Sequence, residues 1–300
     1  MAIKMDGKKC AAEFKDKVAH WIKYECGRVP KLLIITVGDD DASKVYVRNK
    51  MRAAEEVGID ARQWQVSRTE YESDLFWCNF IGRVNCVDGV ILQLPVPEWC
   101  DAAGFLTRIP EEKDVDELTY RQAGKLHLGM DDALLPCTPA GICALIQSYM
   151  PSTALCGKNA LVIGRSDLVG RPIAELLLQM DMNVTICHSK TPRDVLFDAF
   201  ARADLVVSAA GRSNLITEWD AMQYFKDNRH YPVADFNFKK HRIIIDVGIN
   251  RDENGKLCGD LPEDFKEKYS EYYTPVPGGV GPMTVAMLML NTYIATVRGV

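Results

Sequence analysis

One lysine stands among apolar residues in a segment that is otherwise typical of an amphipathic helix. In SKVYVRNKMRAAEEVGI, Tyr46, Lys50 and Val57 recur at helical spacing and share one face. We expect Ser43 to cap this helix and Gly58 to end it. A lysine so placed usually extends to water, but one that faces a binding site can transfer protons or activate water near neutral pH. Lys50, with the phenol of Tyr46 one turn before it, is our candidate catalytic residue.

Three further polar side chains could assist such a lysine. Gln93 interrupts the apolar run VILQLPVP, where a buried amide either belongs to a structural network or points to a ligand from the carboxyl end of a strand. Both interpretations stay open. Asp114 and Asp116 in PEEKDVDELT are loop carboxylates that either stay hydrated or bind a planar pair of donors such as an amino-pyrimidine.

A glycine loop between an apolar strand and a helix indicates a dinucleotide site. In NALVIGRSDLVGRPIAELLL, Gly164 and Gly170 lie where the backbone must approach a pyrophosphate, and the start of the following helix attracts anions. The pattern G-R-S-x-x-x-G differs from G-x-G-x-x-G, so a tight turn without a ligand is the alternative interpretation.

The end of the next strand favours one cofactor over the other. Domains that prefer NAD usually carry an acidic residue there, about 20 residues after the glycines. This chain has ICHSKT instead, with His188, Ser189 and Lys190, and Arg165 stands in the glycine loop. Because these groups offer positive charge and hydrogen-bond donors to a 2′-phosphate, the sequence predicts NADP.

A proline- and glycine-rich loop precedes the last helix. TPVPGGVGPMTVAML has three prolines and three glycines between Pro275 and Pro282. Such a loop either lends backbone groups to a flat ligand or forms a tight entrance to the helix.

Two α/β domains are expected to position these residues, since 300 residues exceed the size at which one core usually stops growing. Strands and helices alternate along the chain, which is typical of parallel sheets. We predict one domain at 1–138, completed by a final helix within 282–300, and a dinucleotide domain at 139–281. The other predicted elements are helix 7–24, helix 43–57, a turn-rich segment 102–135, and strands in KLLIITVG, VDGVILQLPVP, NALVIGRS, MNVTICHS, ADLVVSAAG and RIIIDVGIN.

Composition excludes several classes of protein. With 36 basic and 41 acidic residues the net charge is -5, which argues against a nucleic-acid binder. We expect neither a secretory signal nor a membrane span, since charges are scattered through MAIKMDGKKCAAEFKDKVAHWI and no later run reaches the length of a span. The ten cysteines include no C-x-x-C pair and no zinc-type spacing, so we expect reduced, mostly buried thiols in the cytosol.

Taken together, these segments resemble the bifunctional methylenetetrahydrofolate dehydrogenase/methenyltetrahydrofolate cyclohydrolase family, almost from end to end. The strings that carry the resemblance are YVRNK with AAEEVGI, DGVILQLPVP, EKDVD, PCTPAGI, VIGRSDLVGRP, ADLVVSAAG, IIDVGIN and TPVPGGVGPMTVAMLM. It implies an N-terminal α/β folate-binding domain, a C-terminal Rossmann-type domain with a doubly wound parallel sheet, and an active cleft between them. It also implies NADP as cofactor, no metal, and a cytoplasmic homodimer in one-carbon metabolism.

The resemblance implies roles by position. Lys50 would be the catalytic lysine, Gln93 its polar partner, Tyr46 the residue that stacks on the substrate, and Asp116 the anchor of the pterin ring. Further folate contacts would come from Leu92, Leu94, Pro277, Gly278, Gly279, Val280 and Gly281. The cofactor contacts would be Thr138, Gly164, Arg165, Ser166, Ser189 and Ile249.

The implied chemistry is oxidation of methylenetetrahydrofolate to the methenyl cation, followed by hydrolysis to formyltetrahydrofolate. A dehydrogenase without the second activity and a folate- or nucleotide-binding protein without catalysis are the alternatives. Two departures from the family stand out. Glu117 occupies a place where the family commonly has glycine, and the chain appears longer than a typical member between Trp219 and Arg242, where we expect a surface insertion.

Overall fold

The computed structural model describes residues 2–218, 220 and 242–299. The expected insertion after Trp219 therefore lies outside the described residues. The chain divides into two compact units. One, the six-strand unit, comprises Met1–Cys10 and Thr138–Met283, and the other, the three-strand unit, comprises Ala11–Cys137 and Thr284–Val300.

The three-strand unit contains a parallel sheet of order β3-β2-β4. Its central strand β2 (Lys31–Val37) is the predicted apolar strand and is buried after its first residue. β3 (Asp60–Val66) was not predicted, because in DARQWQV only Trp64 and Val66 are buried, as befits an edge strand. β4 (Gly89–Leu92) is shorter than predicted, although the backbone N–H of Gln93 still donates to Ile35 O at 2.8 Å.

Helices and an aromatic cluster complete the core of this unit. α1 (Gly7–Tyr24) has the predicted bounds, and α4 (Phe76–Asn85) was not predicted. The turn-rich segment after residue 102 also holds short helices. These are α5 (Ala102–Leu106), the 3-10 helix η1 (Glu111–Lys113) and α6 (Tyr120–His127), and α3 (Arg68–Tyr71) lies earlier in the chain. Trp64, Phe76, Phe80 and Phe105 pack together between these helices and the sheet.

The helix that carries Lys50 starts two residues earlier than predicted. α2 spans Asp41–Val57, and its N-cap is Asp40, whose side chain accepts from the backbone N–H of Ser43 at 2.7 Å. The prediction that Ser43 caps the helix was wrong, because an aspartate three residues upstream supplies the acceptor. Gly58 ends the helix as predicted, with a left-handed φ of 85°.

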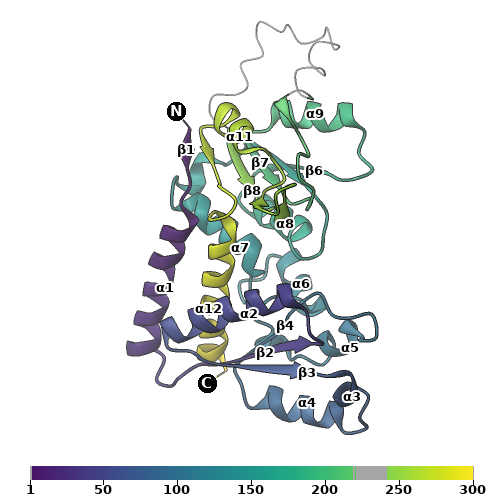
Figure 1. Ribbon diagram of the computed structural model, residues 1–300. Helices are drawn as coiled ribbons and strands as arrows, with labels where there is room; N and C mark the ends of the chain where they lie inside the picture. The colour runs from purple at the N-terminus through teal and green to yellow at the C-terminus, as the bar shows by residue number, and fades with distance from the viewer. Residues whose placement is uncertain (1, 219, 221–241, 300) are drawn as a thin grey trace, which may run out of the picture. The chain divides into compact units, whose positions relative to one another are not determined.

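The six-strand unit contains a fully parallel sheet of order β1-β11-β8-β7-β5-β6. The four predicted strands are β5 (Asn159–Ile163), β6 (Asn183–Cys187), β7 (Leu205–Ser208) and β8 (Ile243–Asp246), and Figure 1 labels three of them, β6, β7 and β8. Since β6 and β7 follow β5 in sequence but flank it on opposite sides, the strand order reverses at β5 and β7. Ligands bind outside the carboxyl ends of the strands at such a point.

Two strands of this sheet were missed by the sequence analysis. β1 (Ile3–Lys4) pairs with β11 (Tyr272–Tyr273), and each has only two residues. A two-residue strand has no periodicity to detect. The hairpin of β9 (Asn250–Arg251) and β10 (Leu257–Cys258) stands apart from this sheet.

Helices pack on this sheet through apolar side chains. α8 (Gly170–Gln179) contacts β5 and β6. α9 (Arg193–Arg202) and α11 (Glu263–Tyr269) contribute Phe197, Phe200 and Phe265 to one core cluster. α7 (Cys137–Gln147) is the helix predicted after Pro136, and the 3-10 helix η2 (Ser152–Ala154) follows it.

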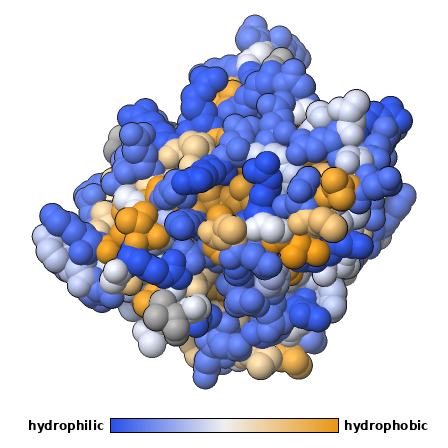
Figure 2. All heavy atoms as spheres, turned by 90° about the horizontal axis from the view of Figure 1, so that it is seen from below, coloured by the Kyte–Doolittle hydropathy of each residue, from blue (hydrophilic) through white to orange (hydrophobic). Residues whose placement is uncertain are grey.

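The final helix α12 (Val280–Arg298) has the length and hydropathy of a membrane span, but 56% of its most apolar stretch is buried within the protein. In the three-strand unit, its Tyr293 stacks on Trp21 of α1, with ring centroids 5.8 Å apart. α12 therefore has the character of a core helix in a soluble protein. On the surface, Figure 2 shows one face on which hydrophilic residues predominate and apolar residues form several groups.

All ten cysteines are free thiols, but the expectation that they are mostly buried was only half right. Cys10, Cys26, Cys100, Cys137 and Cys187 are buried, whereas Cys78, Cys86 and Cys156 are exposed and the other two are intermediate.

Replacing the N-cap of α2 tests the corrected helix start. Asp40→Ala should lower the free energy of unfolding by about 1 kcal/mol, because the Ser43 N–H loses its acceptor. Ser43→Ala is the matched control and should change stability by less than about 0.5 kcal/mol, since alanine is favoured within a helix. Chemical denaturation of both variants measures the difference, and an equal loss in both would contradict the assignment of the cap.

Candidate active site

The structure joins Lys50 of α2 to Gln93 at the end of β4. Lys50 Nζ donates to Gln93 Oε1 at 3.0 Å, and Gln93 Nε2 donates to Leu94 O at 2.9 Å. Because the amide nitrogen is engaged by the backbone, its oxygen faces the lysine. Both side chains are half-buried. The sequence left open whether Gln93 belongs to a structural network or serves a ligand, and the structure shows that its carbonyl oxygen orients Lys50.

Side chains around this pair offer a flat surface and a polar hollow. Tyr46, one turn before Lys50, is 43% exposed, so its ring is free to stack on a planar group. Leu92 is buried and Leu94 is half-buried. A shallow hollow, open to solvent, lies within the same unit and is lined in part by Gln93, Thr36, Gln63 and Pro95.

The two aspartates of the loop at residues 114–116 (the DVD loop) have different surroundings. Asp114 is buried and accepts from the backbone N–H groups of Leu118 at 3.1 Å and Thr119 at 2.7 Å. Burial raises the pKa of Asp114 despite these hydrogen bonds. Asp114 therefore holds the turn together, whereas Asp116 is half-buried and is the carboxylate of this pair that is accessible to a ligand.

A buried amide and a buried thiol support this loop, and the sequence analysis missed both. Asn291 of α12 donates through Nδ2 to Val115 O at 2.9 Å and to Leu135 O at 2.7 Å. The Cys137 thiol donates to Val115 O at 3.2 Å. Asn291 is the polar residue in the apolar run MLMLNTYI, so the interruption that revealed Gln93 could have revealed it too.

The Cys137 thiol lies near charged side chains of the three-strand unit. Complete burial raises the pKa of this thiol well above its ordinary value, and the charge of Asp116 raises it further. The charge of Lys50 opposes this effect. Both charges are therefore close enough to influence the same buried thiol.

Glu117, which stands where the family commonly has glycine, has an unusual environment. Its φ is 57°, in the left-handed region that favours glycine, and only 5% of the residue is exposed. Burial, followed by the charges of Asp114 and Asp116, raises its pKa to about 8. Its Oε1 has no hydrogen-bond partner among the residues that the structure describes. Glu117 thus holds a proton at neutral pH.

The predicted rigid loop belongs to the six-strand unit. The backbone N–H of Gly279 donates to Pro275 O at 2.9 Å, which closes a tight turn, and Gly278 has a φ of 109°. Pro277 and Gly281 are exposed, whereas Gly279 and Val280 are buried. The loop is therefore rigid, and Pro277 and Gly281 are the members most accessible to a ligand.

The glycine loop after β5 fits a dinucleotide. A Cβ atom on Gly164, whose φ is 127°, would lie 2.3 Å from Ala209 O in the loop after β7. A Cβ atom on Gly170 would lie 2.5 Å from Gly164 O. Neither position admits a side chain, so the backbone forms a close turn at the start of α8. This turn stands at the reversal of strand order, with helical N–H groups available to phosphates.

The other predicted cofactor residues surround the same edge of the sheet, with one exception. Arg165 and Ser166 are exposed in the glycine loop, Ser189 is exposed after β6, and Ile249 is 53% exposed after β8. Thr138 is half-buried on α7, and no contact places it with the others.

The loop after β6 offers further polar groups. The backbone N–H of Lys190 donates to His188 Nδ1 at 3.2 Å, and the N–H of His188 donates to Thr191 Oγ1 at 2.9 Å, so this loop is ordered. The residues that the structure describes include no group of three or more histidine, cysteine or acidic side chains arranged to hold a metal ion.

Fold and site together define a two-unit α/β enzyme with an NAD(P)-binding domain, and comparison with known proteins agrees. Residues 5–116 match the tetrahydrofolate dehydrogenase/cyclohydrolase catalytic domain, and residues 136–224 and 231–299 match the NAD(P)-binding domain of the same enzymes. The chain belongs to the tetrahydrofolate dehydrogenase/cyclohydrolase family. The resemblance found in the sequence is confirmed.

Individual relatives match over nearly their whole length. The bifunctional protein FolD of Streptococcus pneumoniae serotype 4 is 41% identical over 300 residues, covering 98% of this chain and 97% of the relative. The crystal structure of bifunctional FolD from Campylobacter jejuni is 34% identical, covers 100% of both chains and has a TM-score of 0.85. The Trypanosoma brucei dehydrogenase-cyclohydrolase, solved with NADP cofactor and inhibitor, is 31% identical with a TM-score of 0.84, covering 99% of this chain and 98% of that one.

The proton on Glu117 makes a testable contribution to stability. In the unfolded chain this carboxyl ionises near its ordinary pKa of 4.5, but in the folded protein it holds the proton to about 8. Folding is therefore progressively disfavoured as the pH rises through this window. Glu117→Gln removes the effect, so its stability relative to the wild type should grow across the window and reach on the order of 1–3 kcal/mol at its upper end.

Denaturant unfolding of wild type and variant at pH values across this window measures the gain. Glu112→Gln, at an exposed position in the same segment, is the matched control and should show no growing difference. A Glu117→Gln variant whose advantage is independent of pH would contradict the protonated state.

Proposed function

We propose that this bifunctional dehydrogenase and cyclohydrolase oxidises 5,10-methylenetetrahydrofolate with NADP and then hydrolyses the methenyl product to 10-formyltetrahydrofolate, using Lys50 as its catalytic residue. The observation that carries the proposal is the hydrogen bond from Lys50 to Gln93 at the carboxyl end of β4. It gives the lysine a fixed direction within the unit that matches the catalytic domain.

Lys50 moves protons during hydrolysis. Water adds its oxygen to the methenyl carbon and loses both of its protons as the formyl oxygen forms; the bond from that carbon to N5 breaks, N5 gains one proton, and the other proton is released to solvent. Lys50 exchanges these protons, and Gln93 Oε1 holds its Nζ in place at 3.0 Å. A group held in the correct direction avoids much of the entropy cost of reaction.

Other residues of the three-strand unit bind the substrate. Tyr46 stacks on the flat pterin, and Asp116 accepts hydrogen bonds from the paired N–H donors of its amino-pyrimidine edge. The half-exposed ring of Tyr46 and the half-buried carboxylate of Asp116 support these roles. Leu92 and Leu94 line the site beside Gln93. From the six-strand unit, the loop from Pro277 to Gly281 adds backbone contacts to the folate.

The six-strand unit binds NADP, which when bound accepts the hydride from the methylene carbon. Gly164 and Gly170 allow the close backbone turn at the start of α8, whose N-terminal N–H groups bind the pyrophosphate. Arg165, Ser166 and Ser189 bind the 2′-phosphate. Ile249 and Thr138 supply further contacts to the cofactor.

We propose a functional division of the chain that differs from the two compact units chiefly in the first ten residues, which lie in the six-strand unit. Residues 1–138 with 282–300 act as the folate-binding domain, and residues 139–281 act as the NADP-binding domain. We also propose a cytoplasmic homodimer. Ten free cysteines, three of them exposed, support a reducing compartment. The homodimer rests on the family resemblance, and analytical ultracentrifugation would test it.

Removing the amine of Lys50 separates the two reactions. Lys50→Met should lower the cyclohydrolase rate by about 10²–10⁴-fold, because the proton-transfer group is lost. The dehydrogenase rate should fall much less, since hydride transfer does not need that proton. Arg52→Met, at a side chain that is 80% exposed two residues away, is the matched control and should leave both rates unchanged.

Both rates are followed by absorbance, with methenyltetrahydrofolate as substrate for hydrolysis and methylenetetrahydrofolate with NADP for oxidation. An undiminished cyclohydrolase rate in Lys50→Met would remove this lysine from the mechanism. An unmodified protein with neither activity would refute the proposed function as a whole.

Cofactor choice is tested by placing an acidic residue after β6. Ser189→Asp should raise the KM for NADP roughly tenfold or more relative to that for NAD, because a carboxylate repels the 2′-phosphate and tenfold corresponds to about 1.4 kcal/mol. Thr153→Asp adds the same charge at an exposed position in η2 and should not alter the ratio. Equal catalytic efficiency of the unmodified enzyme with both cofactors would contradict the preference for NADP.

A further inference from the structure

A buried carboxylate, Asp260, ties together two loops at the carboxyl edge of the six-strand sheet. The residue has no exposed surface. Five donors converge on its two oxygens, and all come from the ends of β7 and β8 or the residues that follow them. Oδ2 accepts from Ser208 Oγ at 3.0 Å, Ala210 N at 2.7 Å and Gly211 N at 3.3 Å, and Oδ1 accepts from Arg212 N and Asn250 Nδ2, both at 2.9 Å.

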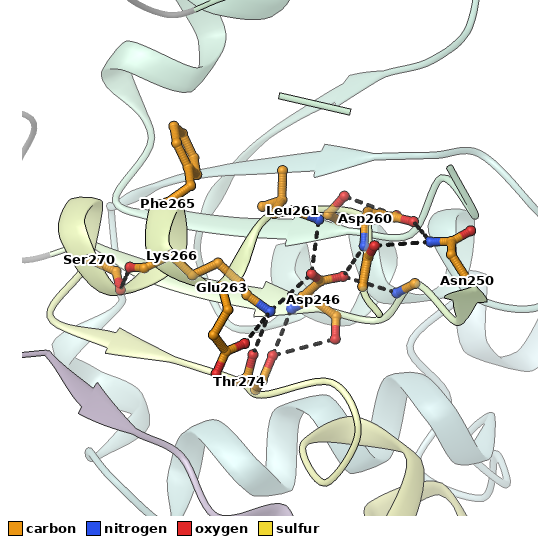
Figure 3. Close-up of polar contacts among 12 residues, drawn as sticks. Asp246, Asn250, Asp260, Leu261, Glu263, Phe265, Lys266, Ser270 and Thr274 are labelled. Atoms are coloured by element: carbon orange, nitrogen blue, oxygen red, sulfur yellow. Dashed lines mark hydrogen bonds and ion pairs between the residues drawn. The ribbon is translucent and has the colours of Figure 1, made fainter. Parts of the chain in front are cut away.

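A second buried carboxylate holds Asp260 in turn. Asp246, the last residue of β8, accepts from the backbone N–H of Asp260 at 2.9 Å and of Leu261 at 3.0 Å, as Figure 3 shows. Lys266, only 1% exposed, forms an ion pair with Asp246 at 3.2 Å and donates to Thr274 O at 3.1 Å. The two aspartates and Lys266 therefore make one connected network within the six-strand unit.

The loops that Asp260 holds are those that form the dinucleotide edge. Ala209 O, next to the N–H groups bound by Asp260, is the atom that packs against Gly164. On the other side, a Cβ atom on Gly248 would lie 2.1 Å from Asp260 Oδ1. Ile249 thus stands between Gly248, which packs on the carboxylate, and Asn250, which donates to it. Asp260 sets the position of both the turn at Gly164 and the exposed side chain of Ile249.

We propose that Asp260 is a positioning residue for the cofactor site, acting through the loops after β7 and β8, with Asp246 and Lys266 holding it in place. The inference rests on the proposed NADP site and deepens it. Asp260 has no exposed surface, so it would act on the cofactor only through these loops. Its effect is to keep backbone segments from β5, β7 and β8 at a fixed spacing around the nicotinamide nucleotide.

The chemistry of the contacts explains why an acid is required. Every hydrogen bond that the Asp260 side chain makes is accepted, none donated. An asparagine would place an NH₂ group against either the donors at Oδ2 or the two donors at Oδ1. At least two hydrogen bonds would be lost, and a donor would face a donor in a site without water access.

Asp260→Asn tests the inference, because the two activities differ in their need for cofactor. We expect the KM for NADP in the dehydrogenase reaction to rise about tenfold, as misplaced loops weaken binding. The cyclohydrolase rate on methenyltetrahydrofolate, measured without NADP, should stay within about twofold of the wild type. Asp264→Asn, at a nearby exposed position, is the matched control and should change neither.

Ser208→Ala is a milder second variant, because it removes one donor to Asp260 and leaves the acid in place. It should raise the KM for NADP by about twofold to fivefold with an unchanged cyclohydrolase rate, and it decides the case if Asp260→Asn does not fold. An unchanged KM for NADP in a folded Asp260→Asn, or an equal loss of both activities in Ser208→Ala, would overturn the inference. Absence of both activities in the wild type would instead count against the proposed function.

Discussion

In the function that we propose, the chemistry depends on the hydrogen bond between Lys50 and Gln93. A lysine that exchanges protons must be oriented without being locked in one protonation state. A carboxylate partner would strongly stabilise the charged form of the lysine. A neutral amide orients the amine through a hydrogen bond and adds no charge of its own. Gln93 can do so because its nitrogen is bound by Leu94 O and its backbone pairs with β2, which leaves only the oxygen for the lysine. The apolar strand β4 thus acts as a rigid support for one polar atom.

The six-strand unit obeys a related constraint, in that flexible loops are fixed by polar groups buried beneath them. The turn at Gly164 packs against the loop after β7 at Ala209. This contact alone would not fix the distance between the two loops. Asp260 removes that freedom by accepting several backbone N–H groups at once, as anion-binding nests do for phosphates. Both units therefore use a polar side chain to fix the position of a neighbouring group.

Local patterns in the sequence were sufficient for the central strands and for α1, and they also singled out Lys50, Gln93 and Gly164 as candidates. What they missed depends on partners distant along the chain. β1 is a strand only because β11 lies beside it, and Asn291 supports the DVD loop across 176 residues of sequence. The N-cap was misassigned because both Asp40 and Ser43 are good caps, and only geometry distinguishes them. The family resemblance was predictable because its strings are long, but the network around Asp260 leaves no comparable local signal.

Glu117 shows how this chain tolerates a residue that its loop does not favour. A left-handed φ costs a non-glycine residue roughly 1–2 kcal/mol, and the buried Oε1, which has no hydrogen-bond partner in the described part of the chain, adds to that cost. A strained backbone conformation persists only where contacts with the surrounding structure hold it in place. Here Asp114 fixes the following residues through Leu118 and Thr119, and Asn291 and Cys137 both hold Val115. Since Val115 before the turn and Leu118 and Thr119 after it are anchored independently, the turn at Asp116 keeps its shape without glycine. The proton on Glu117 removes the charge repulsion between this carboxyl and the carboxylates of Asp114 and Asp116.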